Sequence, residues 1–452
     1  MIKIKKSFSL FLKAFLLIHI ENTTYTQETW INVYIHGIMS IAPHLTFGNF
    51  IRFMNDSVIH TLYAKQVELI RNDPFFSFGQ AMQQLGLHQL YPTDLEIGKA
   101  GNAIAAISNA IDTDLGNNNN NYYYTFGWTG LLSPKQRYYD AHELFVSLTE
   151  LVNNFEAENK IKPKIRIIGY SHGGNVSLNL AAVRRTLYPD SPLIIDEQVL
   201  IGVPLVTETD FLVADKIFKK TYHIFSPHDR IQQIDLFSFS RLFSRKIFKN
   251  RHNFKIPDNL FQIQIKIMKP RGKDSPKRKQ LRQNMSNPAI VSGSHHLLSN
   301  VSPGHIELWF FGWTPQHYRP HFILNPLPLV VFLPYIINSL RSCEPFINQQ
   351  EIIIFDIRPE DEIAIIKQYQ DKMYFKKFRF FDKKRLSNFA TMGLKTKPES
   401  YSNKNFKEHI KNACKKAARY YRLKLRPLKL HDRYPEREVR MRQTQLKPFE
   451  YK

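Results

Sequence analysis

Cysteine is nearly absent from this sequence, which contains only Cys343 and Cys414 among its 452 residues. A single pair excludes the dense disulfide framework of small secreted domains, and neither cysteine lies in a CxxC spacing, which excludes the common zinc and redox motifs. We therefore expect no metal and no cofactor. Because 43% of the residues are hydrophobic, the chain can instead bury a large apolar core. Its length corresponds to roughly two or three domains.

Long apolar runs are also missing. A helix that spans a bilayer needs about 20 apolar residues, and the longest candidate, residues 322–340 (FILNPLPLVVFLPYIINSL), is broken by three prolines. We expect this candidate to be an irregular buried or interfacial segment. Residues 1–22 begin with basic residues followed by an apolar stretch, which is the order found in signal peptides. However, Lys13 interrupts the stretch and no A-x-A-like cleavage site follows.

The N-terminal segment 1–22 therefore has three interpretations: a poor signal peptide, a basic amphipathic helix on a membrane surface, or a buried first helix. The first two imply export or membrane association, and we favour them over a cytoplasmic location. The cysteine content does not decide the redox compartment.

Acidic residues are few relative to basic ones: 39 Asp and Glu stand against 63 Lys and Arg, a net charge of +24. The excess lies in two segments, because residues 241–282 hold 14 basic and 2 acidic residues, and residues 371–452 hold 25 and 8. Such segments would attract an anionic membrane surface or nucleic acid, although they can also serve only as solvated surfaces. The second segment has no evident base-stacking aromatic motif, so we expect lipid rather than nucleic acid.

Short strand-like runs alternate with helical patterns along most of the chain. Ser133-Pro134, for example, is a typical helix start, and apolar residues at helical spacing follow it. Strands that alternate with helices predict an α/β fold, with a mostly parallel sheet and helices on both faces. We expect strands over residues 32–35, 122–126, 165–170, 199–203, 222–225, 261–268 and 351–356, and helices over 134–151, 176–187, 208–218 and 405–423.

Residues 41–120 interrupt this alternation because they carry no strong strand signal. Apolar residues in the stretch 49–70 have a loose helical spacing, so we expect a helical insertion. The insertion could cover an apolar substrate as a lid, or it could pack as an additional helical subdomain, and both interpretations remain open. The aromatic side chains available for either role are Phe50, Phe53, Phe75, Phe76 and Phe78.

The stretch GYSHGG at residues 169–174 matches Gly-x-Ser-x-Gly, with Ser171 at its centre. It lies between a buried strand and an amphipathic helix, which is the context that a nucleophile elbow requires. Gly169 and Gly173 would avoid side-chain clashes across such a tight turn, and the helix N-terminus would direct partial positive charge at a developing oxyanion. The alternative is a glycine-rich turn between strand and helix that has no chemistry.

Four short stretches together resemble the α/β-hydrolase family, and within it the lipase and esterase group. They are His36-Gly37 after the first core strand, residues 169–174, residues 226–229 (SPHD) after a later strand, and Gly304-His305. The resemblance covers roughly residues 30–315. It implies an α/β-hydrolase fold, a Ser–Asp–His triad in that chain order, an oxyanion hole made of two backbone amides, and hydrolysis of an acyl ester or thioester.

By this resemblance, Ser171 is the nucleophile, Asp229 the acid and His305 the general base. Asp229 comes just after a strand, where the family places the acid, although an aspartate there could also cap the next helix. His305 follows a loop, precedes an apolar element and lies downstream of the strand 261–268. The alternative base is His296.

The resemblance also implies the two donors of the oxyanion hole. One is the amide of His172, the residue after the nucleophile, and the other is the amide of Ile38, in the turn after His36-Gly37. This turn departs from the HGGG form of the family, because Ile38 and Met39 stand in place of the later glycines. An apolar pair beside the site would suit an acyl chain, and it would equally suit the core.

These observations divide the chain into three parts. Residues 1–22 are a signal-like or amphipathic segment, residues 23–325 a hydrolase domain with an insertion at 41–120 and a basic loop at 241–282, and residues 326–452 a basic C-terminal extension. The expected function is that of a serine hydrolase of the lipase or esterase kind, which cleaves an acyl ester near a membrane. The competing hypothesis is a non-catalytic basic protein that binds membrane or nucleic acid on a degenerate hydrolase scaffold.

Overall fold

A computed structural model gives the fold of most of the chain. It describes residues 28–38, 58–59, 61–117, 119–206, 209–229, 244–272, 276, 280, 297–314, 318–368 and 374–425. The N-terminal segment 1–22 and the alternative base His296 lie outside these residues.

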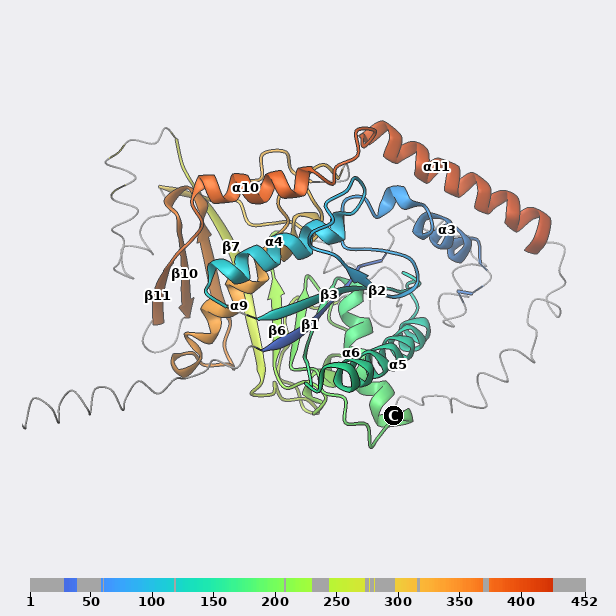
Figure 1. The fold of residues 1–452 in the computed structure, drawn as a ribbon, viewed down its shortest axis with the longest axis horizontal. Helices are drawn as coiled ribbons and strands as arrows, with labels where there is room; N and C mark the ends of the chain where they lie inside the picture. The colour runs from blue at the N-terminus through green and yellow to red at the C-terminus, as the bar shows by residue number, and fades with distance from the viewer. Residues whose placement is uncertain are drawn as a thin grey trace, which may run out of the picture.

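The described strands form one central sheet of 11 strands (Figure 1). Its order is β11-β10-β9-β7-β6-β5-β4-β1-β3-β2, and the short β8 pairs with β7. All pairs from β9 through to β3 are parallel, whereas β2, β10 and β11 pair antiparallel at the two edges. The predicted mostly parallel sheet is therefore confirmed. The strands are β1 Thr29–Ile35, β2 Gly86–Leu90, β3 Asn120–Gly127, β4 Lys164–Tyr170, β5 Glu197–Ile201, β6 Thr221–Phe225, β7 Leu260–Pro270, β8 Leu298–Asn300, β9 Ile353–Arg358, β10 Ile363–Gln368 and β11 Tyr374–Arg379.

Helices cover both faces of the sheet, with α5 and α6 on one side and α4, α9 and α10 on the other (Figure 1). Alternate residues of β1 belong to opposite cores, because successive side chains of a strand point to opposite faces. Val33 and Ile35 pack with α5 and α6, and Tyr34 packs with α4 and α9. In the described part of the chain, the α-helices are α3 Leu62–Arg71, α4 Ala100–Asp114, α5 Pro134–Asn159, α6 His172–Leu187, α9 Leu333–Arg341, α10 Lys383–Leu394 and α11 Asn403–Tyr420.

Short single turns connect several of these elements. They are the 3₁₀ helices η1 Pro74–Phe76, η2 Asp210–Ala214, η5 Ile306–Leu308, η6 Leu329–Phe332, η7 Glu344–Phe346 and η8 Pro359–Asp361, and the π turn η9 Tyr421–Leu425. The helix predicted over residues 208–218 is wrong in extent, because the described part of that stretch holds only η2. The helix start at Ser133-Pro134 is confirmed, since the Ser133 side chain accepts a hydrogen bond of 3.0 Å from the backbone N–H of Gln136.

Residues 41–120 are not a purely helical insertion. The strand β2 pairs antiparallel with β3 and forms one edge of the sheet, and α4 belongs to the core on the second face. The sequence of β2, GLHQL, has none of the β-branched or aromatic residues that favour strands. A half-exposed edge strand with a single partner tolerates such a sequence, which explains why the prediction missed it. Phe50 and Phe53 lie outside the described residues.

The domain boundary predicted at residue 325 is wrong, because strands on both sides of it belong to one sheet. Beyond it, β9 pairs in parallel with β7, and β10 and β11 extend the sheet further. The stretch 322–340 provides η6 and α9, which are buried on the sheet in the same core as Phe389 of α10. The C-terminal segment is thus part of the folded body as far as α10, and it is not an appended extension.

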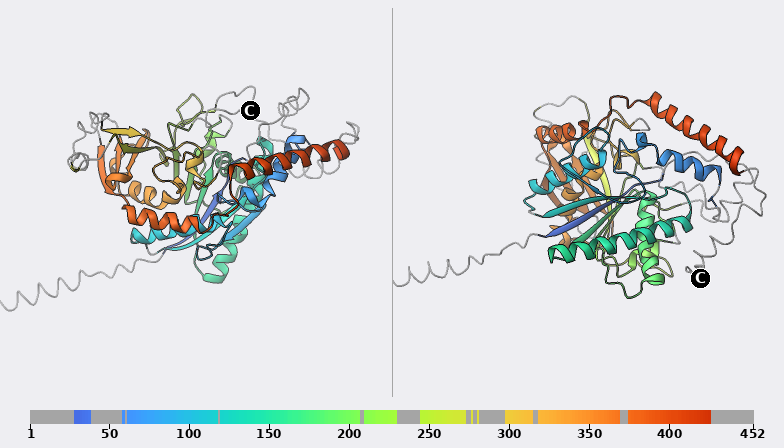
Figure 2. Two further views of the ribbon diagram at one scale, coloured as in Figure 1. Left: turned by 90° about the horizontal axis from the view of Figure 1, so that it is seen from above. Right: turned by 45° about the vertical axis from the view of Figure 1, so that its right-hand side comes forward.

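A separate aromatic cluster joins α3 and η1 to α11. It contains Phe75 and Phe76 together with Tyr401 and Phe406, and the rings of Phe75 and Tyr401 stack at 4.5 Å. In both views of Figure 2, α11 (red) lies beside α3 (blue). Within the described part of the chain, no helix is both long and apolar enough to cross a membrane.

We expect Phe389→Ala to destabilise the whole domain by about 3–5 kcal/mol, because it empties a fully buried aromatic position. The matched control is Leu394→Ala on the same helix, where the side chain is 47% exposed and little stability should be lost. Urea unfolding followed by circular dichroism measures both variants. Equal stability of the two would contradict the inclusion of α10 in the folded body.

Candidate active site

Ser171 occupies a strained turn between a buried strand and a helix. The strand β4 ends at Tyr170 and α6 begins at His172, so Ser171 is the only residue between them. Its backbone dihedrals are φ 51° and ψ −133°, and a positive φ is unfavourable for a residue with a side chain. The backbone N–H of Ser171 donates to the carbonyl of Ile201 at 2.9 Å. The predicted sharp strand-to-helix turn at Ser171 is therefore present.

Glycines flank Ser171 because backbones approach each other closely there. A Cβ atom on Gly169 would lie 2.6 Å from the Cα of Gly174, across the turn. A Cβ on Gly173 would lie 2.3 Å from the carbonyl oxygen of His36 and 2.6 Å from that of Ile35. Since real Cβ atoms do not approach other atoms this closely, only glycine permits the first turn of α6 to lie against the end of β1.

Ser171, Asp229 and His305 lie together, at the carboxyl edge of the sheet. The Nδ1 of His305 is 2.7 Å from Oδ2 of Asp229, and its Nε2 is 3.1 Å from the Oγ of Ser171. All three residues are buried, with 4%, 0% and 9% of Ser171, Asp229 and His305 exposed. The Asp229 carboxylate holds the proton of a neutral His305 on Nδ1, which leaves the Nε2 lone pair facing the Ser171 hydroxyl.

The loops that carry the acid and the base are bonded to each other. Asp229 follows β6, and in the same loop the hydroxyl of Ser226 donates to the carbonyl of Pro303. The ring of His228 contacts the carbonyl of Ser302 at 3.2 Å. Because these bonds precede His305 by only a few residues, they fix the distance between the carboxylate and the imidazole.

A buried carboxylate shapes the loop around His305. Glu307 accepts from the backbone N–H of Gly304 at 2.8 Å and from the side chain of Arg319 at 2.7 Å. Arg319 also donates to the carbonyl of Ser302 at 2.7 Å. This pair clamps both sides of the turn that presents the His305 ring.

Tyr170 packs beneath the imidazole. Its hydroxyl donates to the carbonyl of His305 at 3.0 Å, and the two ring centroids lie 4.7 Å apart. Burial, together with the nearby carboxylates of Asp229 and Glu307, raises the pKa of Tyr170 well above its usual value. The phenol therefore stays neutral and serves as a donor.

The turn expected to supply the second oxyanion donor lies directly beside Ser171. A Cβ on Gly37 would be 3.1 Å from the Cβ of Ser171. His36 is buried, and its Nδ1 donates to the carbonyl of Gly37 at 2.6 Å. Burial, and to a smaller degree the charge of Arg71, lowers the pKa of His36 to about 3, so the ring is neutral. Ile38 follows this turn and packs against the core on the α5 and α6 face.

His172, the other expected oxyanion donor, contacts a buried arginine. The guanidinium of Arg137 donates to the Nδ1 of His172 at 2.6 Å. Burial lowers the pKa of His172 well below its usual value, and the charge of Arg137 lowers it further. The side chain of His172 is therefore a neutral acceptor, and the imidazole positioned to take a proton from Ser171 is that of His305.

Sequence reasoning missed the residues that support the site. For Arg137 a signal existed: it lies four residues before Ala141 and seven before Leu144, on the stripe that α5 buries. A charged residue on a buried stripe indicates a buried polar partner. No such pattern marks Glu307 or Tyr170, whose roles depend on contacts across the fold.

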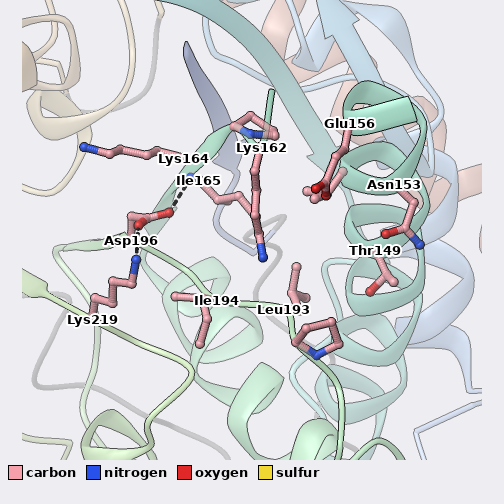
Figure 3. A pocket seen from close by; sticks show the side chains of 13 residues that line it. Thr149, Asn153, Glu156, Lys162, Lys164, Ile165, Leu193, Ile194, Asp196 and Lys219 are labelled. Carbon is pink, nitrogen blue, oxygen red and sulfur yellow. Dashed lines mark hydrogen bonds and ion pairs between the residues drawn. The ribbon is translucent and has the colours of Figure 1, made fainter. Parts of the chain in front are cut away.

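A pocket of about 280 Å³ lies at the opposite edge of the sheet (Figure 3). Lys164, which begins β4, lines it, whereas Ser171 follows the end of the same strand, roughly 20 Å away at the rise of a β-strand. Within the pocket, Asp196 accepts from Lys219 at 2.7 Å and from the backbone N–H of Ile165 at 3.0 Å. The pocket is thus separate from the triad. Among the residues that the structure describes, no group of His, Cys, Asp or Glu side chains is arranged to hold a metal ion.

We expect Gly173→Ala to destabilise the fold by about 1–3 kcal/mol or more, because the added methyl group meets backbone atoms of β1 that cannot rotate away. The control is Gly174→Ala, where the three atoms nearest to the added methyl group all belong to the Val203 side chain, with Cγ2 at 2.2 Å. Adding Val203→Ala should restore part of the stability lost in Gly174→Ala. No side-chain truncation should rescue Gly173→Ala. Thermal unfolding of the parent and these three variants measures this, and a fully stable Gly173→Ala protein would contradict the close approach.

Comparison with known proteins assigns no family to the chain. No family model matches it, and no curated protein matches it. The arrangement of Ser171, Asp229 and His305 is therefore the main observation from which a function can be argued.

Proposed function

We propose that this chain is a serine hydrolase of the α/β-hydrolase family, similar to lipases and esterases, that cleaves an acyl ester. One observation carries the proposal: Asp229, His305 and Ser171 form a buried series. The Oδ2 of Asp229 lies 2.7 Å from the Nδ1 of His305, and the Nε2 of His305 lies 3.1 Å from the Oγ of Ser171. This is the hydrogen-bonded order of acid, base and nucleophile in the serine hydrolase triad. The three residues also follow the chain order Ser, Asp, His of the family.

The first chemical step forms an acyl-enzyme. The Oγ of Ser171 attacks the ester carbonyl carbon while the Nε2 of His305 takes the hydroxyl proton. Asp229 stabilises the resulting imidazolium through the bond to Nδ1. When the tetrahedral intermediate collapses, the carbon–oxygen bond to the leaving alcohol breaks and His305 returns its proton to that alcohol.

The second step releases the acid. Water attacks the acyl-enzyme, His305 takes its proton, and the bond from the carbonyl carbon to the Oγ of Ser171 breaks as the proton passes to that oxygen. In both steps the negative charge on the carbonyl oxygen would be stabilised by the backbone N–H groups of His172 and Ile38. The N-terminus of α6, which begins at His172, adds favourable partial charge.

The position of each residue on the sheet supports the same family. Ser171 follows β4, which lies beside β1 with its His36-Gly37 turn, and Asp229 follows β6 two strands further along. The base comes after the short β8, which pairs with β7, the next strand in the sheet. Ligands of open parallel sheets bind at the carboxyl ends of the strands, where these residues gather.

We expect Ser171→Ala to abolish labelling by a fluorophosphonate probe and to lower kcat for a short p-nitrophenyl ester by roughly 10⁶-fold. His305→Ala should have a similar effect, and Asp229→Asn a somewhat smaller one, about 10⁴-fold. Either change combined with Ser171→Ala should cost little more, because the three residues act as a unit. Ester hydrolysis assays with the purified variants measure kcat, and mass spectrometry of the labelled peptide identifies the residue that reacts with the probe.

The control is Ser191→Ala, which removes a hydroxyl in the turn after α6 that accepts from the backbone N–H of Leu193 at 3.3 Å. It should label and turn over like the parent. If the folded parent protein neither reacts with the probe nor hydrolyses the ester, the competing hypothesis of a non-catalytic binding protein on a degenerate scaffold is favoured. If Ser171→Ala still labels, Ser171 is not the nucleophile.

A further inference from the structure

The helix α11 is docked through one side only. Phe406 and Ala413 are buried in the aromatic cluster with η1 and α3, and Ala417 on the same helix is fully buried. The Nδ1 of His409 forms a hydrogen bond of 2.6 Å with the carboxylate of Asp73, which caps the start of η1. The apolar side of this amphipathic helix is therefore already covered by the protein itself.

The outer side of α11 is strongly basic. The helix carries six Lys and Arg residues and a single acidic one, Glu408, and all seven are exposed. Most of the basic residues recur every three or four positions, so they form one stripe along an 18-residue helix that is about 27 Å long. We call this stripe the basic ridge; it consists of Lys404, Lys407, Lys411, Lys415, Lys416 and Arg419.

The elements beneath the basic ridge contact the carboxyl edge of the sheet, where Ser171 lies. Arg71, the last residue of α3, donates to the carbonyl of Trp128, which directly follows β3. The Trp128 ring stacks on His36 at 5.7 Å. His36 in turn precedes Gly37, which lies so close to Ser171 that a Cβ added to it would be 3.1 Å from the Cβ of Ser171. A continuous series of contacts thus links the support of α11 to the nucleophile.

A second series of contacts reaches the other side of the triad. The Trp313 indole donates to the carbonyl of Phe78 at 3.2 Å, just after η1. The backbone N–H of Phe311 donates to the carbonyl of Gly79 at 2.9 Å. Phe311 and Trp313 belong to the segment that follows His305. The η1 region, on which α11 rests, is therefore held to both the nucleophile and the base sides of the candidate site.

We propose that the basic ridge binds an anionic lipid surface and so brings the Ser171 edge of the sheet to that surface. This inference rests on the proposed ester hydrolysis, and it identifies the substrate as an ester carried in an anionic lipid layer. A straight row of single positive charges matches a plane of anionic headgroups, and each Lys or Arg near such a surface contributes to binding. Because the apolar side of α11 is occupied, the attraction would be mainly electrostatic.

Two features favour lipid over nucleic acid. Along the basic ridge itself no aromatic ring alternates with the charges, whereas single-stranded nucleic acid is typically held by stacked rings as well as by charge. At the C-terminal end of the helix, Tyr420 and Leu423 are 42% and 63% exposed. An exposed aromatic and an exposed leucine beside basic residues are typical of segments that lie in a membrane interface.

The experiment compares two triple variants of the full chain with equal loss of charge. The test variant is Lys407→Gln, Lys411→Gln and Lys415→Gln on the basic ridge. The control variant is Lys160→Gln, Lys162→Gln and Lys216→Gln, three exposed residues near the amino edge of the sheet. Binding is measured by co-sedimentation with vesicles of phosphatidylserine and phosphatidylcholine, with pure phosphatidylcholine vesicles, and by gel shift with single-stranded and duplex DNA. Turnover is measured with a soluble p-nitrophenyl ester and with an ester embedded in the anionic vesicles.

The test variant should lose affinity for anionic vesicles by on the order of a hundredfold, and should lose hydrolysis of the vesicle-borne ester to a similar extent. Its hydrolysis of the soluble ester should match that of the parent, which shows that the triad and the fold are intact. The control variant should lose much less, and binding by the parent should fall steeply as salt rises. Equal loss in both variants, equal binding to neutral vesicles, or binding only to DNA would overturn the inference. If the parent protein binds anionic vesicles but hydrolyses neither ester, the proposed hydrolase function is contradicted, whereas lipid binding by the basic ridge is not.

Discussion

Two backbones meet where β1 ends and α6 begins, and the candidate site depends on how closely they approach. Because Gly173 has no side chain, the first turn of α6 can lie directly on the carbonyl groups of Ile35 and His36. This contact brings Ser171 next to the His36-Gly37 turn. It also requires the chain to reverse sharply at Ser171, which is the physical reason for the positive φ of that residue.

The cost of this strained turn is offset by polar groups that are satisfied inside the protein. Asp229 is fully buried, and a buried carboxylate without partners would be strongly unfavourable. Its bond to His305, and the bonds between the Ser226 and Pro303 loops, mean that the acid and the base hold each other in place. The orientation of the imidazole is thus set in the folded protein before any ligand arrives, which is the condition for efficient proton transfer.

The parts of the fold that could be predicted from the sequence are those in which local pattern and tertiary environment agree. The central strands are continuous apolar runs because both faces are buried, and the helix at Ser133-Pro134 has its capping residues beside it in the chain. The strand β2 failed this rule, since its sequence has low strand propensity and its pairing with β3 decides its conformation. Likewise, nothing near residue 353 indicates that β9 pairs with β7, about 90 residues earlier. Within the site, Ser171, Asp229 and His305 were each assigned from motif and chain order, whereas Tyr170 and Glu307 act through contacts that no local pattern records.

The pairing of β9 with β7 has a consequence for the order in which the protein can be made. The residues of the candidate triad have all emerged once His305 is synthesised, but at that stage one edge of β7 still has unpaired backbone N–H and C=O groups between Ile263 and Ile267. An open, apolar strand edge is a site where other chains can add. The nascent chain therefore passes through an interval in which β7 is paired with β6 and, near its end, with the short β8. The part of β7 that later pairs with β9 stays open until residues 353–357 arrive and close it against association with other nascent chains.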